Sequence, residues 1–138
     1  MRAAQFRAMR ETLGLSQQDV ADEVGVGCGS VKSWEAGVCP IPPDVARWLV
    51  GEKAVADYAV DSAVCDVLVL QNQPTTMSLT YYRTQEEYDS SGHGEGRFGI
   101  SNANARRVAE ALEAEGIDVE FFYPGEVEEV EQANGPIR

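Results

Sequence analysis

Hydrophobic positions in the first fifty residues recur at steps of three and four, the spacing of a helix with one buried face. Phe6, Met9 and Leu13 begin the pattern, and Gly14 interrupts it. Glycines and prolines break the chain again after the later stretches, as is typical of helix ends. The pattern predicts a bundle of short helices, at residues 6–13, 17–24, 28–36 and from 43 onward.

Ser16 is expected to cap the second of these helices. Asp19 follows three residues later, so the pair is a near variant of the capping box, in which each side chain bonds to the other residue's backbone N–H. The second helix should end at Gly25, and the third should bury Val31 and Trp34.

A longer helical stretch follows, from Glu52 to Leu70. Gly51 either interrupts the fourth helix before it or only weakens that helix, by about 1 kcal/mol. The long stretch is apolar on two faces, one containing Val55 and the other Val60. Such a helix needs more cover than one small domain usually offers. We therefore expect a second copy of the chain to cover part of it.

The pattern changes after a linker at residues 71–74. Residues 77–82 and 118–123 are rich in β-forming side chains, which predicts two strands. Between them, Thr84 should cap a short helix, and Ser101 or Asn102 should cap a longer one that runs to about residue 115. The second half is therefore expected to be α+β.

The net charge of −12 is unevenly distributed over the 138 residues. Residues 1–50 hold five basic and six acidic side chains, whereas residues 51–138 hold six basic and seventeen acidic ones. The first half can therefore still present cations to a polyanion. Residues 125–138 are expected to be a disordered acidic tail, which either repels polyanions or only aids solubility.

The chain offers little for catalysis or for a metal. Its three cysteines, at positions 28, 39 and 65, form no Cys-x-x-Cys pair, and His93 is the single histidine. Glycines 92, 94 and 96 are expected to form a plain flexible loop that holds no phosphate. We expect reduced thiols, no metal, no cofactor and no enzyme activity. The longest aliphatic run, residues 67–70, is too short for a membrane span, which favours a cytoplasmic protein.

Three stretches of the first half carry a recognisable motif. Residues 15–21 read LSQQDVA, residues 24–26 read VGV and residues 31–37 read VKSWEAG. Over about residues 4–50 the chain resembles the helix-turn-helix of Cro/cI-type (XRE) transcriptional regulators. This resemblance implies that the helix at 28–36 enters the major groove of DNA. It also implies a structural ion pair between Arg10 and Glu35.

The resemblance assigns the DNA contacts by position. Gln17, at the start of the second helix, would approach a phosphate. The base-facing residues would be Cys28, Gly29, Ser30, Lys32 and Ser33. Cys28 and Gly29 depart from the family pattern, because relatives often carry Gln, Arg or Asn there. Base recognition would therefore depend on Lys32, Ser30 and Ser33, with help from DNA shape.

The rest of the chain resembles a narrower group, the YdiL-like and anti-CRISPR-associated (Aca) regulators. The resemblance uses residues 34–37 and 41–45, the long helix, and residues 81–84 with the aromatic-rich tail that follows. It implies a homodimeric repressor of its own operon that binds a palindromic operator in double-stranded DNA. The alternatives are an antitoxin-like protein whose acidic C-terminal half binds a basic protein, and an RNA-binding regulator.

The expected fold class is mainly α, in three parts. Residues 1–50 would form a helix-turn-helix DNA-binding domain, residues 51–124 a dimerisation region with a long helix and a small α+β part, and residues 125–138 the acidic tail.

Overall fold

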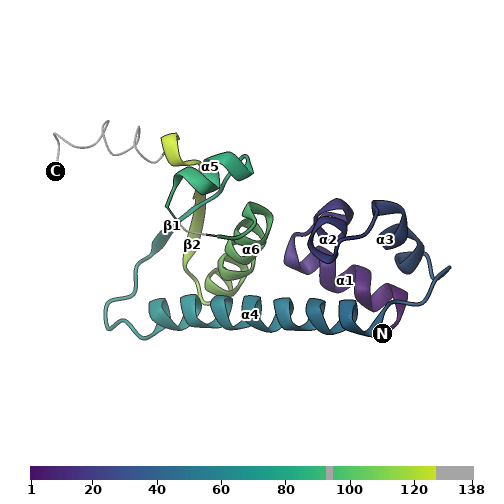
Figure 1. The fold of residues 1–138 in the computed structure, drawn as a ribbon. Helices are drawn as coiled ribbons and strands as arrows, with labels where there is room; N and C mark the ends of the chain where they lie inside the picture. The colour runs from purple at the N-terminus through teal and green to yellow at the C-terminus, as the bar shows by residue number, and fades with distance from the viewer. Residues whose placement is uncertain (93–94, 127–138) are drawn as a thin grey trace. The chain divides into compact units, whose positions relative to one another are not determined.

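The computed structural model describes residues 1–92 and 95–126 (Figure 1). The chain divides into two compact units, Met1–Ala59 and Val60–Arg138. The predicted loop residues 93 and 94 and all but the first two residues of the predicted tail lie outside the described part. The fold is mainly helical with one small sheet, as expected, and each unit has its own core.

The first unit contains three short helices and the start of a long one. Their bounds are α1 (Ala3–Leu13), α2 (Gln17–Val24), α3 (Cys28–Glu35) and α4 (Pro43–Leu68). The predicted helices of this half are thus confirmed within a few residues. Gly51 lies inside α4, so it does not interrupt the helix.

Local chemistry explains where α1 and α2 end. Gly14 and Gly25 both take the left-handed backbone conformation, with φ of 75° and 73°, which costs little only without a side chain. The predicted capping box is present at the start of α2. Asp19 N donates to Ser16 Oγ at 2.9 Å, and Ser16 N donates to Asp19 Oδ2 at 2.8 Å.

All four helices contribute to the core of the first unit. Phe6 of α1 contacts Trp34 of α3 edge to face, with ring centroids 6.1 Å apart. Val31 is fully buried and Trp34 is 6% exposed, as predicted. The buried apolar residues are Phe6, Leu13, Leu15, Val20, Ala21, Val31, Trp34, Val45, Leu49 and Ala56.

In its described residues, the second unit contains the end of α4, two helices and a two-stranded sheet. Its further elements are β1 (Thr76–Thr80), α5 (Gln85–Ser90), α6 (Phe98–Ala114) and β2 (Asp118–Phe122). The strands are parallel, with Thr76 opposite Asp118 and Thr80 opposite Phe122. Both predicted strands are confirmed, although β1 ends before Tyr81 and β2 before Tyr123.

One helix start was predicted wrongly. Neither Ser101 nor Asn102 caps α6, which begins at Phe98. Asn102 is instead buried inside the helix, where its Oδ1 accepts from Tyr82 N at 2.9 Å and its Nδ2 donates to Tyr82 O at 2.8 Å. Asn102, whose type suggested a helix cap, therefore makes a tertiary contact with the backbone of Tyr82. Thr84 does cap α5, since its Oγ1 accepts from Glu87 N at 3.1 Å.

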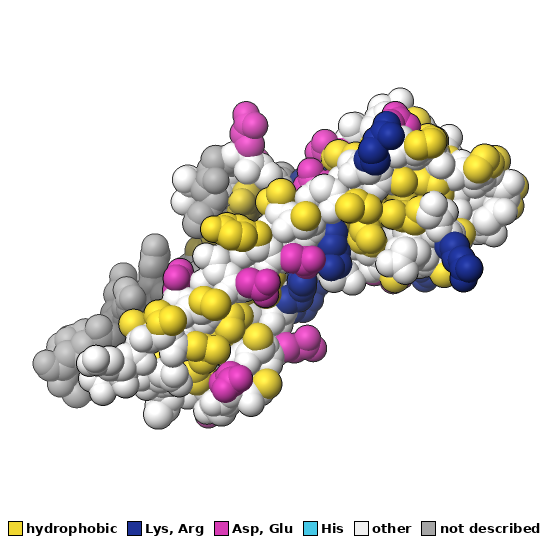
Figure 2. All heavy atoms as spheres, turned by 90° about the horizontal axis from the view of Figure 1, so that it is seen from below, with side chains coloured by type: hydrophobic (Ala, Val, Ile, Leu, Met, Phe, Trp, Pro, Cys, Tyr) yellow, Lys and Arg dark blue, Asp and Glu magenta, His cyan; other side chains and the backbone are white. Residues whose placement is uncertain are grey.

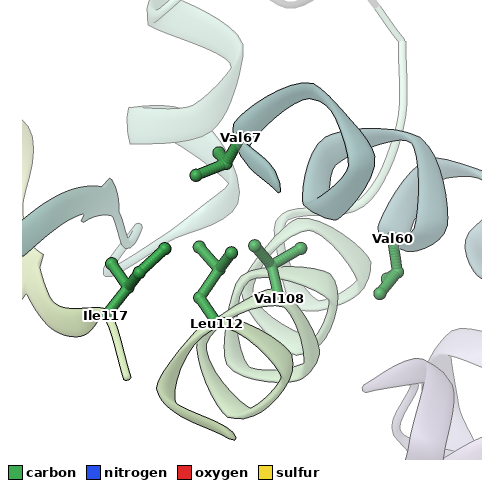
Figure 3. Packing of buried hydrophobic residues seen from close by; sticks show 5 residues of the cluster. All are labelled: Val60, Val67, Val108, Leu112 and Ile117. Carbon is green, nitrogen blue, oxygen red and sulfur yellow. The ribbon is translucent and has the colours of Figure 1, made fainter. Parts of the chain in front are cut away.

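The core of the second unit lies between α4 and α6 (Figure 3). Val60 and Val67 of α4 point toward Val108 and Leu112 of α6, and Ile117 closes the cluster beside β2. The half-buried strand residues that pack against this cluster are Met77, Leu79 and Val119. The two helices thus supply the apolar cover that one face of the small sheet requires.

Of the two apolar faces predicted for α4, only one is buried within the chain. Val60 is 6% exposed, whereas Val55 is 69% and Tyr58 is 77% exposed. Hydrophobic side chains accordingly reach the surface in the view from below (Figure 2). No helix in the described part of the chain has both the length and the hydropathy to cross a membrane.

The Asn102 contact gives a stability prediction. Replacing Asn102 with Ala removes the buried side chain that bonds to both the N–H and the C=O of Tyr82. Loss of a buried hydrogen-bond partner costs about 1–3 kcal/mol. We expect urea unfolding to show a loss of that size or more for Asn102→Ala and almost none for the exposed control Asn72→Ala. Equal stabilities of the two variants would contradict this account.

Candidate nucleic-acid interface

Two buried side chains determine which face of α3 meets solvent. Val31 and Trp34 lie in the core of the first unit, three residues apart on one side of the helix. The opposite side must therefore face outward, because residues three or four apart share a helix face. Gly29, Ser30 and Lys32 are exposed there.

The predicted contact residues are not equally accessible. Cys28 and Ser33 are half-buried at the margins of this face, and Cys28 carries a free thiol. Gly29, Ser30 and Lys32 form the accessible part, which we call the α3 face. It offers one ammonium, one hydroxyl and an uncovered stretch of backbone to a ligand.

Gly29 is not required by the packing of the chain itself. A Cβ added at Gly29 would meet no atom within 4 Å, and its φ is not positive. A glycine inside a helix nevertheless costs about 1 kcal/mol relative to alanine. A position that is open in the free chain and lacks a side chain lets another molecule approach the helix backbone closely.

Gln17 is the first residue of α2, as predicted, and its side chain has a partner within the chain. It is half-buried, and its Nε2 donates to Glu35 Oε1 at 3.2 Å. In this structure its amide therefore links the start of α2 to the end of α3. The sequence placed Gln17 at the start of the second helix and Glu35 in the third, but no local pattern predicted that the two side chains meet.

A buried ion pair orients α3 against α1. Arg10 Nε donates to Glu35 Oε2 at 2.6 Å and Arg10 Nη2 to Glu35 Oε1 at 2.9 Å, a two-pronged contact. The side chains are 11% and 4% exposed. Arg10 Nη1 also donates to the carbonyl of Leu15 at 2.9 Å, at the entry to α2. The predicted structural pair is confirmed, and the bond to Leu15 was not foreseen.

The ion pair shifts the pKa of both partners. The hydrogen bond to Glu35 raises the pKa of Arg10 further above its ordinary value. Burial alone would raise the pKa of Glu35, but the hydrogen bonds from Arg10 and Gln17 outweigh it and lower that pKa. Both groups are therefore charged at neutral pH, and neither is free to contact a ligand.

The pair gives a pH-dependent stability prediction. Because the pKa of Glu35 lies below its ordinary value of 4.5, its stabilising effect is complete above that value and is lost as the pH falls below it. Glu35→Gln removes the negative charge beside Arg10 but keeps an amide oxygen that can accept from it, so we expect a cost of about 1–3 kcal/mol at pH 7. We expect the gap in unfolding free energy between the two proteins to narrow below pH 4.5. A gap that stays constant down to pH 3 would contradict the prediction.

A comparison with known families covers most of the chain. The family model described as Aca2/YdiL-like matches residues 1–121, which include the first unit and the second unit through most of β2. No curated protein gives a significant match. The match extends well beyond the helices around α3 and reaches the sheet of the second unit. The chain therefore belongs to the Aca2/YdiL-like family.

Proposed function

We propose that this protein is a sequence-specific DNA-binding transcriptional regulator that acts as a homodimeric repressor, without enzyme activity. The observation that carries the proposal is the exposure of Gly29, Ser30 and Lys32 on a helix held from behind by Val31 and Trp34. A short helix anchored in this way, after a helix and a tight turn, is the arrangement that enters the major groove in helix-turn-helix proteins.

The α3 face has groups that suit base edges and phosphates. The Lys32 ammonium can donate to guanine O6 and N7 or to a phosphate oxygen, and the Ser30 hydroxyl can donate or accept. The open backbone at Gly29 permits close approach to the groove. Cys28 and Ser33 flank this surface. Gln17, at the first turn of α2, can reach a phosphate if it leaves Glu35.

Two copies are needed because one α3 face is a weak reader. It carries a single cation, so one copy gains little from phosphate or guanine contacts. Two copies whose reading helices are about 34 Å apart meet successive major grooves of a palindromic operator and combine their affinities. Family membership supports a regulator of the anti-CRISPR-associated type, which would repress its own operon.

The acidity of the second half supports a different candidate. Residues 51–138 carry seventeen acidic and six basic side chains, which suits an antitoxin-like protein bound to a basic partner protein. Recovery of one basic protein with the purified chain, together with no protected DNA upstream of its gene, would favour this candidate. A preference for folded RNA over duplex DNA would favour an RNA-binding regulator.

Lys32 provides the direct test of the proposed reading face. Lys32→Ala should reduce operator affinity by about tenfold or more, as expected for loss of a specific base contact worth about 1–3 kcal/mol. It should not change the unfolding free energy, because Lys32 is exposed. Lys53→Ala removes the same charge from α4 and serves as the control in DNA titrations.

The two outcomes of that titration are distinct. A loss of affinity for Lys32→Ala alone supports the orientation of α3, whereas equal affinities of both variants would refute it.

Trp34→Ala, which removes a core aromatic, should instead destabilise the first unit by about 3–5 kcal/mol.

Gly29 separates stability from binding. Gly29→Ala should raise the unfolding free energy by up to about 1 kcal/mol, because alanine favours the helix and the added Cβ meets no atom. The same methyl group should weaken operator binding if the helix backbone lies close to the bases. A stabilised variant that binds the operator as tightly as the wild type would show that no close approach occurs at Gly29.

A further inference from the structure

The outer edge of β1 has free backbone groups. Asp118 N donates to Thr75 O at 3.0 Å, and Tyr81 N donates to Phe122 O at 2.8 Å, so the odd-numbered residues of this segment face β2. Because successive peptide groups of a strand point to opposite sides, Thr76, Ser78 and Thr80 direct their N–H and C=O groups away from β2. Within residues 1–92 and 95–126 no other strand pairs with them.

The two edges of the sheet differ in charge. The β1 sequence, Thr-Met-Ser-Leu-Thr, contains no charged residue, and the side chains of Thr76, Ser78 and Thr80 are exposed. β2 carries exposed carboxylates at Asp118 and Glu120. Charged residues usually protect an open edge from pairing with another chain. β1 lacks this protection and β2 has it.

The sheet is also unusually small for a parallel one. Parallel strands normally occur in larger sheets with cover on both faces, and two strands alone are marginally stable. Here the helices cover the face of Met77, Leu79 and Val119 only. Further strands added at β1 would extend the sheet without displacing any bond of the chain.

We propose that β1 pairs antiparallel with β1 of a second copy, around a two-fold axis at Ser78. The proposal rests on the proposed homodimer and assigns its contact. Ser78 then lies opposite Ser78 of the partner subunit, and Thr76 lies opposite Thr80 of the partner subunit. The three residues whose N–H and C=O groups point outward are thus the ones that the two-fold axis places opposite each other. They form the hydrogen-bonded type of antiparallel pair.

The sequence of β1 favours a second copy over another partner. Its order, Thr-apolar-Ser-apolar-Thr, reads nearly the same in both directions, so the two-fold axis places similar residues opposite one another. Met77 lies beside the partner's Leu79, which continues the apolar face of the sheet. Two chains that each carry a net charge of −12 repel, so their contact favours an uncharged segment. Pairing through β2 would instead bring four carboxylates together.

A disulfide test distinguishes this axis from other dimers. The full chain is prepared with its three native cysteines replaced by serine, and Ser78→Cys or Thr76→Cys is added. Opposite residues of a hydrogen-bonded antiparallel pair have Cα atoms about 5.5 Å apart, within the range of about 4.4–6.8 Å that a disulfide spans, and their Cβ atoms need to approach by about 1 Å to close the bond. The two copies of residue 76 would lie about 14 Å apart, since four residues of strand separate them along the pair.

Each outcome decides the proposal. Oxidation should link most of the Ser78→Cys chains and few of the Thr76→Cys chains, at least a tenfold difference in rate. A mixture of Thr76→Cys and Thr80→Cys chains should link to each other. A protein that scatters light at roughly twice 15.0 kDa but links equally slowly at all these positions keeps the dimer and overturns the β1 contact. A monomer at micromolar concentration overturns both.

Charge at the axis gives a second, reversible readout. Ser78→Lys alone and Ser78→Glu alone should each raise the dimer dissociation constant at least tenfold, since like charges would face each other across the axis. Mixing the two variants should restore the dimer. Ser91→Lys, at the exposed end of α5, controls for the added charge. Unchanged dimerisation of Ser78→Lys would overturn the proposed β1 contact. The test of DNA binding with Lys32→Ala does not depend on that contact, so the two proposals can fail separately.

Discussion

One buried ion pair, together with the buried side chains of Val31 and Trp34, sets the orientation of α3. Arg10 holds both carboxylate oxygens of Glu35 and the carbonyl of Leu15, so a single guanidinium joins α1, the entry to α2 and the end of α3. Such a pair adds little net stability, because removing both charges from water offsets most of their attraction. Its effect is on geometry: a rotated α3 would leave two buried charges unpaired.

That constraint explains which side chains of α3 remain exposed. With Val31 and Trp34 buried and Glu35 bound to Arg10, the outward groups of α3 are few and small. Lys32 supplies the charge, and Gly29 supplies space. For the DNA-binding function proposed above, specificity would come from fit to the groove and from a second copy rather than from many bidentate contacts.

The second unit is held together by helices packed on a small sheet and by a buried polar contact. Its helices bury one face of a sheet that has two strands in the described residues, and Asn102 bonds the backbone of Tyr82 to α6. The polar side chain of Asn102 is buried because the backbone N–H and C=O of Tyr82, just after β1, need hydrogen-bond partners away from water. The two edge strands of the sheet differ in charge, because β1 has no charged residue and β2 carries exposed carboxylates. The β1 edge is therefore the better suited of the two to pair with another strand.

Patterns in the amino-acid sequence predicted the helices of the first unit, the capping box of α2 and the presence of both strands, and the family motif predicted the Arg10–Glu35 pair. These features depend on neighbouring residues or on a motif of fixed spacing. Three further features became clear from the three-dimensional packing: α4 continues through Gly51, α6 begins at Phe98, and Gln17 bonds to Glu35. It also set the parallel direction of the strands and the buried face of α4. Each of these depends on packing between distant segments, and such packing leaves no local pattern in the chain.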